Sequence, residues 1–136
     1  MDADTPAVTR RNPYPESLGL TRLGGGVGFG KFAFDPRPHD MNGVGAVHGG
    51  VIAGLLDLVC AMGAGAHPDP KQRQFSITLS LNINFVGAAR PERLICTGRR
   101  IGGGRRNVFV EGRIEHEDGF LVATAQGAFK LMAPGA

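Results

Sequence analysis

The segment from Gly49 to Ala66 has the periodicity of a helix and is apolar on nearly every side. Large side chains recur at spacings of three and four on one face, namely Val51, Ile52, Leu55, Leu58, Val59 and Met62. The opposite face carries small residues around one acid, Asp57. A helix that is apolar all round is normally buried, so we expect other elements to surround this one. Pro68 and Pro70 prevent the helix from continuing.

The remainder of the chain predicts antiparallel strands. Apolar and polar residues alternate without a break over residues 75–86, which is the period of a β-strand. Further strands are expected at residues 27–34, 94–101, 107–116 and 120–132. One central helix and five or six antiparallel strands make an α+β arrangement in which a long curved sheet wraps the helix.

Length and composition predict one globular domain. The chain has 136 residues, of which 42% are hydrophobic and 20% charged, enough for one buried core. We expect an N-terminal arm over residues 1–18 and a single domain over residues 19–136. No stretch is long and apolar enough to span a membrane, and no secretory signal is legible. The two cysteines, Cys60 and Cys96, show no disulfide or metal spacing, which favours a cytoplasmic location.

Asp57 is the leading candidate for a functional side chain. It is the only formal charge between Asp40 and Asp69, and it lies about nine residues into the predicted helix, too deep to cap the N-terminus. A lone carboxylate among small apolar residues is costly to bury unless it is paired, neutralised or used. Two interpretations remain open, a functional acid and a charge that simply faces solvent.

The loop before the helix predicts a site for a negatively charged group. It ends in His48-Gly49-Gly50 at the expected helix N-terminus. Glycines there allow another molecule to approach the free backbone N–H groups, and the helix dipole makes this end weakly positive. This arrangement suits a phosphate or a carbonyl oxygen that gains negative charge. The alternative is that the glycines serve tight packing and that His48 is a hydrogen-bonded structural residue.

Arginine dominates the basic residues. The chain has a net charge of +3, and seven arginines fall between residues 90 and 113. Their rigid guanidinium groups suit phosphate or carboxylate, whereas the alternative is a solvated hairpin tip. With one Tyr, no Trp and no aromatic residue between the arginines of the basic hairpin at residues 99–106, the sequence argues against a nucleic-acid partner. The histidines have no partners at metal-ligand spacing, so we expect no metal.

The run Asn42-x5-His48-Gly49-Gly50-x6-Asp57, followed by the alternating strand, resembles the hotdog-fold acyl-CoA thioesterases, in particular the phenylacetate-degradation (PaaI-like) type. The resemblance extends over about residues 19–132. It implies a long helix wrapped by an antiparallel sheet, and a homodimer in which two sheets become continuous. It also implies a dimer of dimers, whose geometry the sequence leaves open.

The resemblance implies a role for each residue of this run. Gly49 would present its backbone N–H to the thioester oxygen, and Asn42 would position the thioester or a water molecule. His48 would hold the loop. Asp57, reaching across from the other subunit, would be a general base or a nucleophile. Thr78 would supply an assisting hydroxyl, with the alternatives Ser76 and Ser80 predicted on the same strand face.

The same resemblance implies a binding role for the arginines, because coenzyme A carries three phosphates. The candidates flank a glycine turn and are Arg99, Arg100, Arg105 and Arg106. Thioester hydrolysis requires no metal and no redox cofactor. Two alternatives stay open, a non-catalytic acyl-CoA sensor and a hotdog hydratase or dehydratase with His48 as the base. The preference among acyl groups is not legible.

Overall fold

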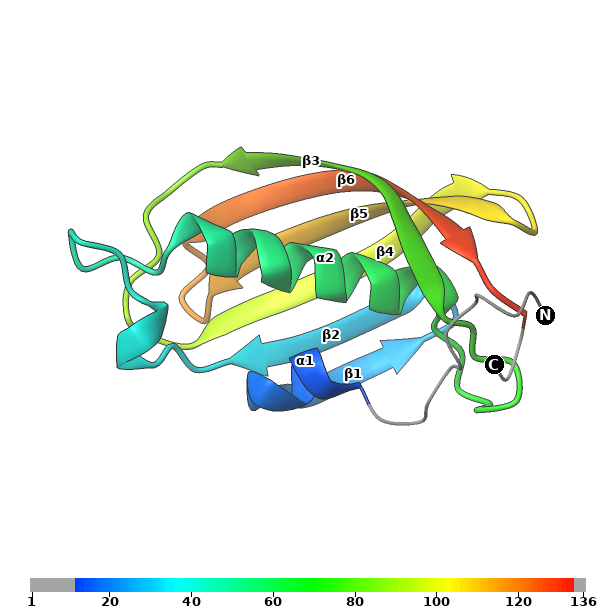
Figure 1. The fold of residues 1–136 in the computed structure, drawn as a ribbon, viewed down its shortest axis with the longest axis horizontal. Coiled ribbons are helices and arrows are strands. Elements are labelled where there is room, and N and C mark those ends of the chain that lie inside the picture. Colours follow the sequence, from blue (N-terminus) through cyan, green and yellow to red (C-terminus); the bar gives the residue numbers. More distant parts are fainter. Residues whose placement is uncertain (1–11, 134–136) are drawn as a thin grey trace.

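The computed structural model describes residues 12–133 and has one main helix surrounded by one sheet. In chain order the elements are α1 (Pro13–Ser17), β1 (Thr21–Gly26), β2 (Phe29–Phe34), η1 (Pro38–Asp40), α2 (Gly49–Gly65), β3 (Ser76–Phe85), β4 (Leu94–Gly103), β5 (Asn107–His116) and β6 (Leu121–Leu131). The strands form a six-stranded antiparallel sheet in the order β1-β2-β4-β5-β6-β3. The sheet curves around α2 (Figure 1), which confirms the predicted α+β hotdog fold.

The core lies between α2 and the concave face of the sheet. The large side chains of α2 that face the sheet, among them Leu55 and Val59, are fully buried with Phe34 and Leu94. The helix approaches β4 so closely that a Cβ at Gly98 would run into the Val59 carbonyl group. Glycine in β4 therefore sets the distance between helix and sheet, and the face of α2 opposite the sheet is left for other contacts.

β3 is an edge strand with a bulge, and the prediction of unbroken alternation was wrong. Its pairing with β6 shifts between Thr78 and Ser80. Before the shift Thr78 points toward α2, whereas after it Leu81 and Ile83 pack against the core. Ser80 therefore does not share a face with Thr78, in contrast to the sequence-based expectation. An extra residue in one strand of an antiparallel pair exchanges the faces in this way.

The predicted N-terminal arm contains structure that the sequence pattern did not indicate. Residues 1–11 of the arm lie outside the described residues. The next residues form the short helix α1, with proline at its first position, and Leu18 behind it is buried in the core. Figure 1 shows α1 on the β1 side of α2, and Tyr14 of α1 approaches α2 at Gly54. Within residues 12–133 no helix has the length and apolarity needed to cross a membrane.

Candidate functional site

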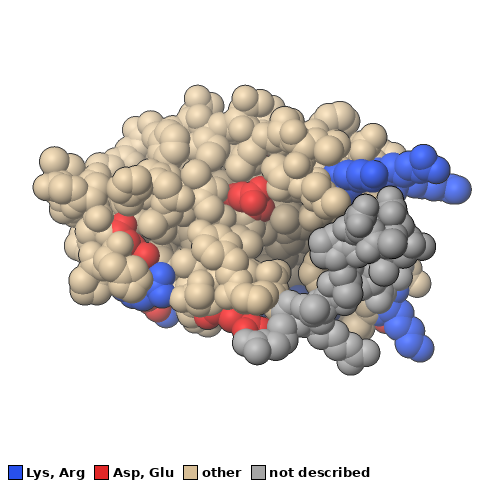
Figure 2. All heavy atoms as spheres, viewed as in Figure 1, with Lys and Arg blue, Asp and Glu red and all other residues tan. Residues whose placement is uncertain are grey.

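Asp57 lies on the face of α2 that the sheet leaves open. Its side chain is partly buried, and the Thr78 hydroxyl of β3 donates a hydrogen bond of 2.6 Å to its Oδ1. The other carboxylate oxygen, Oδ2, has no hydrogen-bond donor within residues 12–133. Figure 2 shows an acidic patch in the middle of this face surrounded by uncharged side chains. The structure thus places the carboxylate and the strand hydroxyl, both of which the sequence analysis named for one site, in direct contact within one chain.

Cys60 lies one turn beyond Asp57 but has no nucleophilic character. Burial and, to a smaller extent, the nearby charge of Asp57 raise the pKa of the Cys60 thiol to about 12. Burial likewise raises the pKa of Cys96 far above its ordinary value. Both thiols stay protonated at neutral pH, and both cysteines are unpaired. Cysteine chemistry at this site is therefore disfavoured.

The N-terminus of α2 presents a backbone N–H group. His48 is the N-cap, and its Nδ1 accepts a hydrogen bond of 2.8 Å from the Gly50 N–H. Nδ1 is thus an acceptor, and the neutral ring carries its proton on Nε2. The Gly49 N–H has no acceptor within the described part of the chain. An amide at the first position of a helix, with the helix dipole behind it, suits a developing oxyanion.

Asn42 shapes the loop that leads to this N-terminus. Its Oδ1 accepts hydrogen bonds of 3.0 Å from the backbone N–H groups of Val44 and Ala46. The amide nitrogen of Asn42 finds no acceptor in residues 12–133. The side chain therefore holds the loop through its oxygen and keeps a donor for another group.

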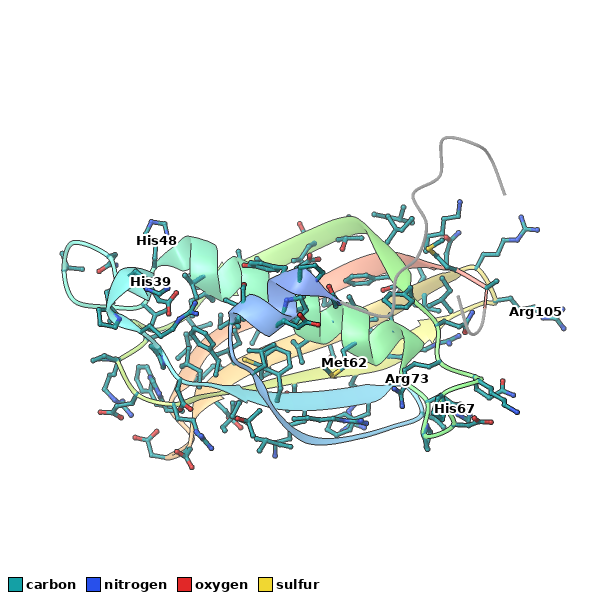
Figure 3. All side chains as sticks on the ribbon, turned by 60° about the horizontal axis from the view of Figure 1, so that its bottom comes forward. His39, His48, Met62, His67, Arg73 and Arg105 are labelled. Atoms are coloured by element: carbon teal, nitrogen blue, oxygen red, sulfur yellow. The ribbon has the colours of Figure 1, made fainter. Side chains whose placement is uncertain are left out.

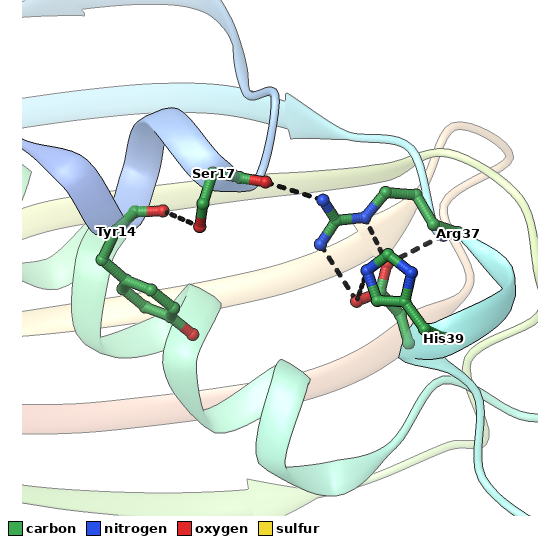
Figure 4. Close-up of polar contacts among 5 residues, drawn as sticks. Tyr14, Ser17, Arg37 and His39 are labelled. Carbon is green, nitrogen blue, oxygen red and sulfur yellow. Dashed lines mark hydrogen bonds and ion pairs between the residues drawn. The ribbon is translucent and has the colours of Figure 1, made fainter.

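Asp40 and Arg37 are structural residues of the site that the sequence analysis missed. Arg37 donates from Nε to Oδ2 of the buried Asp40 at 2.9 Å and from Nη2 to Oδ1 at 3.2 Å, as Figure 4 shows. These bonds hold the pKa of Asp40 below its ordinary value. The Asp40 carbonyl in turn accepts a hydrogen bond of 2.8 Å from the His48 N–H. The sequence does contain a signal for this pair, because Arg37 precedes Asp40 by three residues in a segment that is rich in proline.

Replacement of Asp40 by asparagine is expected to destabilise the protein by about 2 kcal/mol, the usual cost of losing hydrogen bonds to a charged group. Because the native pKa of Asp40 is lowered, its contribution is present above the ordinary value of 3.8 and is lost as the pH falls through the native value. Urea unfolding of the wild type and Asp40→Asn should therefore differ most near neutral pH and converge in acid. Glu111→Gln, on the exposed surface, is the control. A difference that grows in acid would contradict this account.

The four candidate arginines are not gathered in one place. Arg99 lies on the sheet face away from α2, with its guanidinium 5.0 Å from the centre of the Phe29 ring, and it lines a hollow of about 590 Å³. Arg100 and Arg105 line a second hollow of about 520 Å³ at the β4–β5 turn, where Arg106 is also exposed. Figure 3 shows Arg105 at the end of the molecule away from His48. The structure thus separates Arg99 from the other three.

Asp57 and Gly49 of the same chain are too far apart to act on one bond. They are separated by eight residues of α2, which is about 12 Å along the helix axis. One chain therefore does not bring its own Asp57 carboxylate and Gly49 N–H to the same bond. No three acidic, histidine or cysteine side chains in the described residues lie close enough to hold a metal ion.

Comparison with known proteins bears on the family and the fold of this chain. Residues 44–123 match the model of the thioesterase superfamily. A conserved protein from Pseudomonas aeruginosa is 28% identical with a TM-score of 0.80, over 90% of this chain and 95% of that chain. The PaaI protein of E. coli, from the phenylacetic acid degradation operon, is 18% identical with a TM-score of 0.81, over 90% and 86%. A thioesterase from Haemophilus influenzae is 17% identical with a TM-score of 0.75, over 87% and 81%. No curated protein is significantly similar in sequence.

Proposed function

Because the chain belongs to the thioesterase superfamily and is accordingly a thioester hydrolase, we propose that it cleaves the thioester bond of an acyl-coenzyme A with Asp57 as the acting carboxylate. The observation that carries this proposal is the hydrogen bond between Thr78 and Asp57 on the open face of α2. That bond fixes one carboxylate oxygen and leaves the other available. A carboxylate positioned in this way suits either general-base or nucleophilic attack on a thioester.

The chemistry requires only a base and an oxyanion donor. In the general-base route Asp57 takes a proton from water, and the oxygen of that water adds to the thioester carbonyl carbon. The Gly49 N–H stabilises the negative oxygen, a contribution of about 3 kcal/mol in comparable sites. The carbon–sulfur bond then breaks, and the thiolate of coenzyme A leaves and is protonated. In the nucleophilic route an Asp57 oxygen adds to the carbonyl carbon, the carbon–sulfur bond breaks and the thiolate of coenzyme A leaves. Water then hydrolyses the resulting mixed anhydride, which releases the acid and regenerates the Asp57 carboxylate.

A composite site between two copies follows from the distance between Asp57 and Gly49 within one chain. Since one chain cannot bring its own Asp57 and Gly49 to one bond, the proposal requires a homodimer. The β3 edge supports such pairing, because on one side it has no partner strand within residues 12–133 and because Ile77 and Leu79 are 51% and 56% exposed. Exposed apolar residues on an open strand edge favour pairing with a second chain. The proposal also includes the association of two such homodimers into a tetramer.

Coenzyme A phosphates are proposed to bind at the β4–β5 turn. Arg100, Arg105 and Arg106 lie there, and Figure 2 shows basic side chains at that end of the molecule. Arg99 is not part of this group because it lies on the other face of the sheet.

Replacement of Arg105 and Arg106 by alanine together is expected to raise the KM for an acyl-CoA about tenfold, as when charge-assisted phosphate contacts are lost. The kcat should change little. The measurement compares an acyl-CoA with a short thioester of the same acyl group that lacks the nucleotide. Arg113→Ala, elsewhere on the sheet, serves as the matched control. An equal rise in KM for both substrates would show that these arginines do not bind the coenzyme A phosphates.

His48 is disfavoured as the base of a hydratase. Its Nδ1 is engaged by the Gly50 N–H, so the ring serves the helix cap. A non-catalytic sensor is disfavoured by the presence of both the Asp57 carboxylate and the Gly49 N–H, two groups that simple binding does not need.

A panel of aliphatic and aromatic acyl-CoAs tests the proposed function. We expect the wild-type protein to release free thiol from at least one of them, measured with a thiol-reactive dye. Binding of the panel without release of thiol would support the sensor and contradict the hydrolase. Absence of both binding and release would contradict acyl-CoA as the substrate class.

A further inference from the structure

The open strip of α2 that carries Asp57 has a different element on each side. β3 flanks it on one side and contributes the Thr78 hydroxyl. On the other side lies α1, as Figure 1 shows. Its Tyr14 reaches α2 at Gly54, three residues before Asp57. Residues three apart are neighbours on a helix surface, so Tyr14 lies beside the strip of α2 that carries Asp57.

Gly54 makes room for the Tyr14 phenol. A Cβ at Gly54 would lie 2.5 Å from the Tyr14 Oη and 3.5 Å from its Cζ. Glycine inside a helix is destabilising relative to alanine, so the position carries a cost in helix stability. The missing side chain allows the phenol to contact the helix backbone closely, about one turn before Asp57.

α1 is fixed relative to α2 by a chain of polar contacts. The Ser17 carbonyl accepts a hydrogen bond of 2.7 Å from Arg37 Nη1, as Figure 4 shows. Arg37 is bound to the buried Asp40, whose carbonyl accepts from the N–H of His48 at the start of α2. Leu18, directly after α1, is buried in the core. The position of Tyr14 is therefore tied to the same loop that positions the Gly49 N–H.

The Tyr14 ring packs against α2 at Gly54, but about half of the residue is accessible to a ligand. It is 52% exposed, and its hydroxyl has no hydrogen-bond partner among residues 12–133. A tyrosine ring offers a large and rigid contact surface with few rotatable bonds. A ring so placed would meet any acyl group that lies along the strip at Asp57.

We propose that Tyr14 is a specificity-determining residue that closes the α1 side of the acyl site. This inference rests on the proposed function, because it assumes an acyl group beside Asp57. The ring limits the width of the strip, so compact acyl groups are preferred over bulky ones. Removal of the ring opens the strip and shifts the preference toward larger acyl groups.

The test is the ratio of kcat/KM for a bulky acyl-CoA to that for a compact one, within a series that differs only in the acyl group. Tyr14→Ala is expected to raise this ratio about tenfold, the lower end of the discrimination that one methylene group gives in an apolar pocket. Tyr14→Phe keeps the ring and should keep the wild-type ratio. Phe109→Ala removes an aromatic ring of equal exposure, 52%, from the sheet face of β5 that is opposite to the buried Val108 and Val110, and it is the matched control, with no change expected.

The outcomes separate the inference from the proposed function. An unchanged ratio in Tyr14→Ala, with thiol release intact, overturns the inference and leaves the hydrolase standing. Failure of the wild type to hydrolyse the series overturns both. If Tyr14→Ala does not fold, Gly54→Ala provides the second variant, because its Cβ displaces the phenol from α2. The same shift in ratio is expected there, and an unchanged ratio overturns the inference.

Discussion

Asp57→Asn is expected to lower kcat for acyl-CoA hydrolysis by at least about 10²-fold, the effect of losing a positioned base or nucleophile. The amide has nearly the shape of the carboxylate, and it retains an oxygen that accepts from Thr78. The fold should therefore persist, with an unchanged thermal midpoint, while the charge that attacks or activates water is gone. Steady-state rates with the preferred acyl-CoA provide the measurement.

Asp69→Asn is the matched control for this change, because Asp69 is an exposed acid beyond the end of α2. It should hydrolyse acyl-CoA at the wild-type rate. Full activity in both Asp57→Asn and Asp57→Ala would remove Asp57 from the reaction.

Gly49→Pro is expected to lower kcat by about 10²-fold to 10³-fold, as when one oxyanion donor is removed. Proline is tolerated at the first position of a helix and deletes only the N–H. The preceding residue, His48, has φ −59° and ψ 139°, which is compatible with a following proline. The substitution thus removes the proposed donor while the helix start is preserved.

Gly49→Ala is the control for the proline variant. It retains the N–H, and its Cβ would lie 3.6 Å from the Phe85 ring, an ordinary contact. Activity near the wild-type level is expected. Equal activity of the alanine and proline variants would show that the Gly49 N–H does not act on the thioester.

A complementation experiment with the Asp57→Asn and Gly49→Pro variants tests whether the site is shared between two chains. When Asp57→Asn and Gly49→Pro chains are produced in one cell, random pairing restores about a quarter of the wild-type sites, because each mixed dimer holds one intact site. Isolation of mixed dimers through two different affinity tags sharpens the measurement. Mixed dimers without activity would contradict a site shared between chains.

The helix and its covering sheet could be predicted because the residues that form them follow simple periods. The apolar face of α2 and Pro68 behind it gave bounds that the structure confirms to within one residue. β5 was predicted with its observed bounds, since Val108 and Val110 alternate with exposed residues. The edge strand β1 was missed because its sequence, rich in glycine, carries little alternation.

The parts of the site that escaped prediction depend on contacts between distant segments. α1 is only five residues long, and its place beside α2 depends on Arg37 and on the missing side chain at Gly54. The separation of Arg99 from Arg100 was legible in principle, because neighbouring residues of a strand point to opposite faces. The grouping of all four arginines had overlooked this alternation. The arrangement of Asp57 and Thr78 required the register of β3, which no local pattern contains.

The bulge in β3 has a consequence for how this strand tolerates changes in length. Loss of the unpaired residue at position 79 would leave Thr78 and Leu81 facing inward as they do now, in an ordinary ladder. Loss of a residue elsewhere in the strand would shift the register of one half of the strand and turn the side chains of that half to the other face. Loss of a residue is thus tolerated best at this one point of the edge, which lies after Thr78, so the spacing between the acid and the hydroxyl along the chain stays the same.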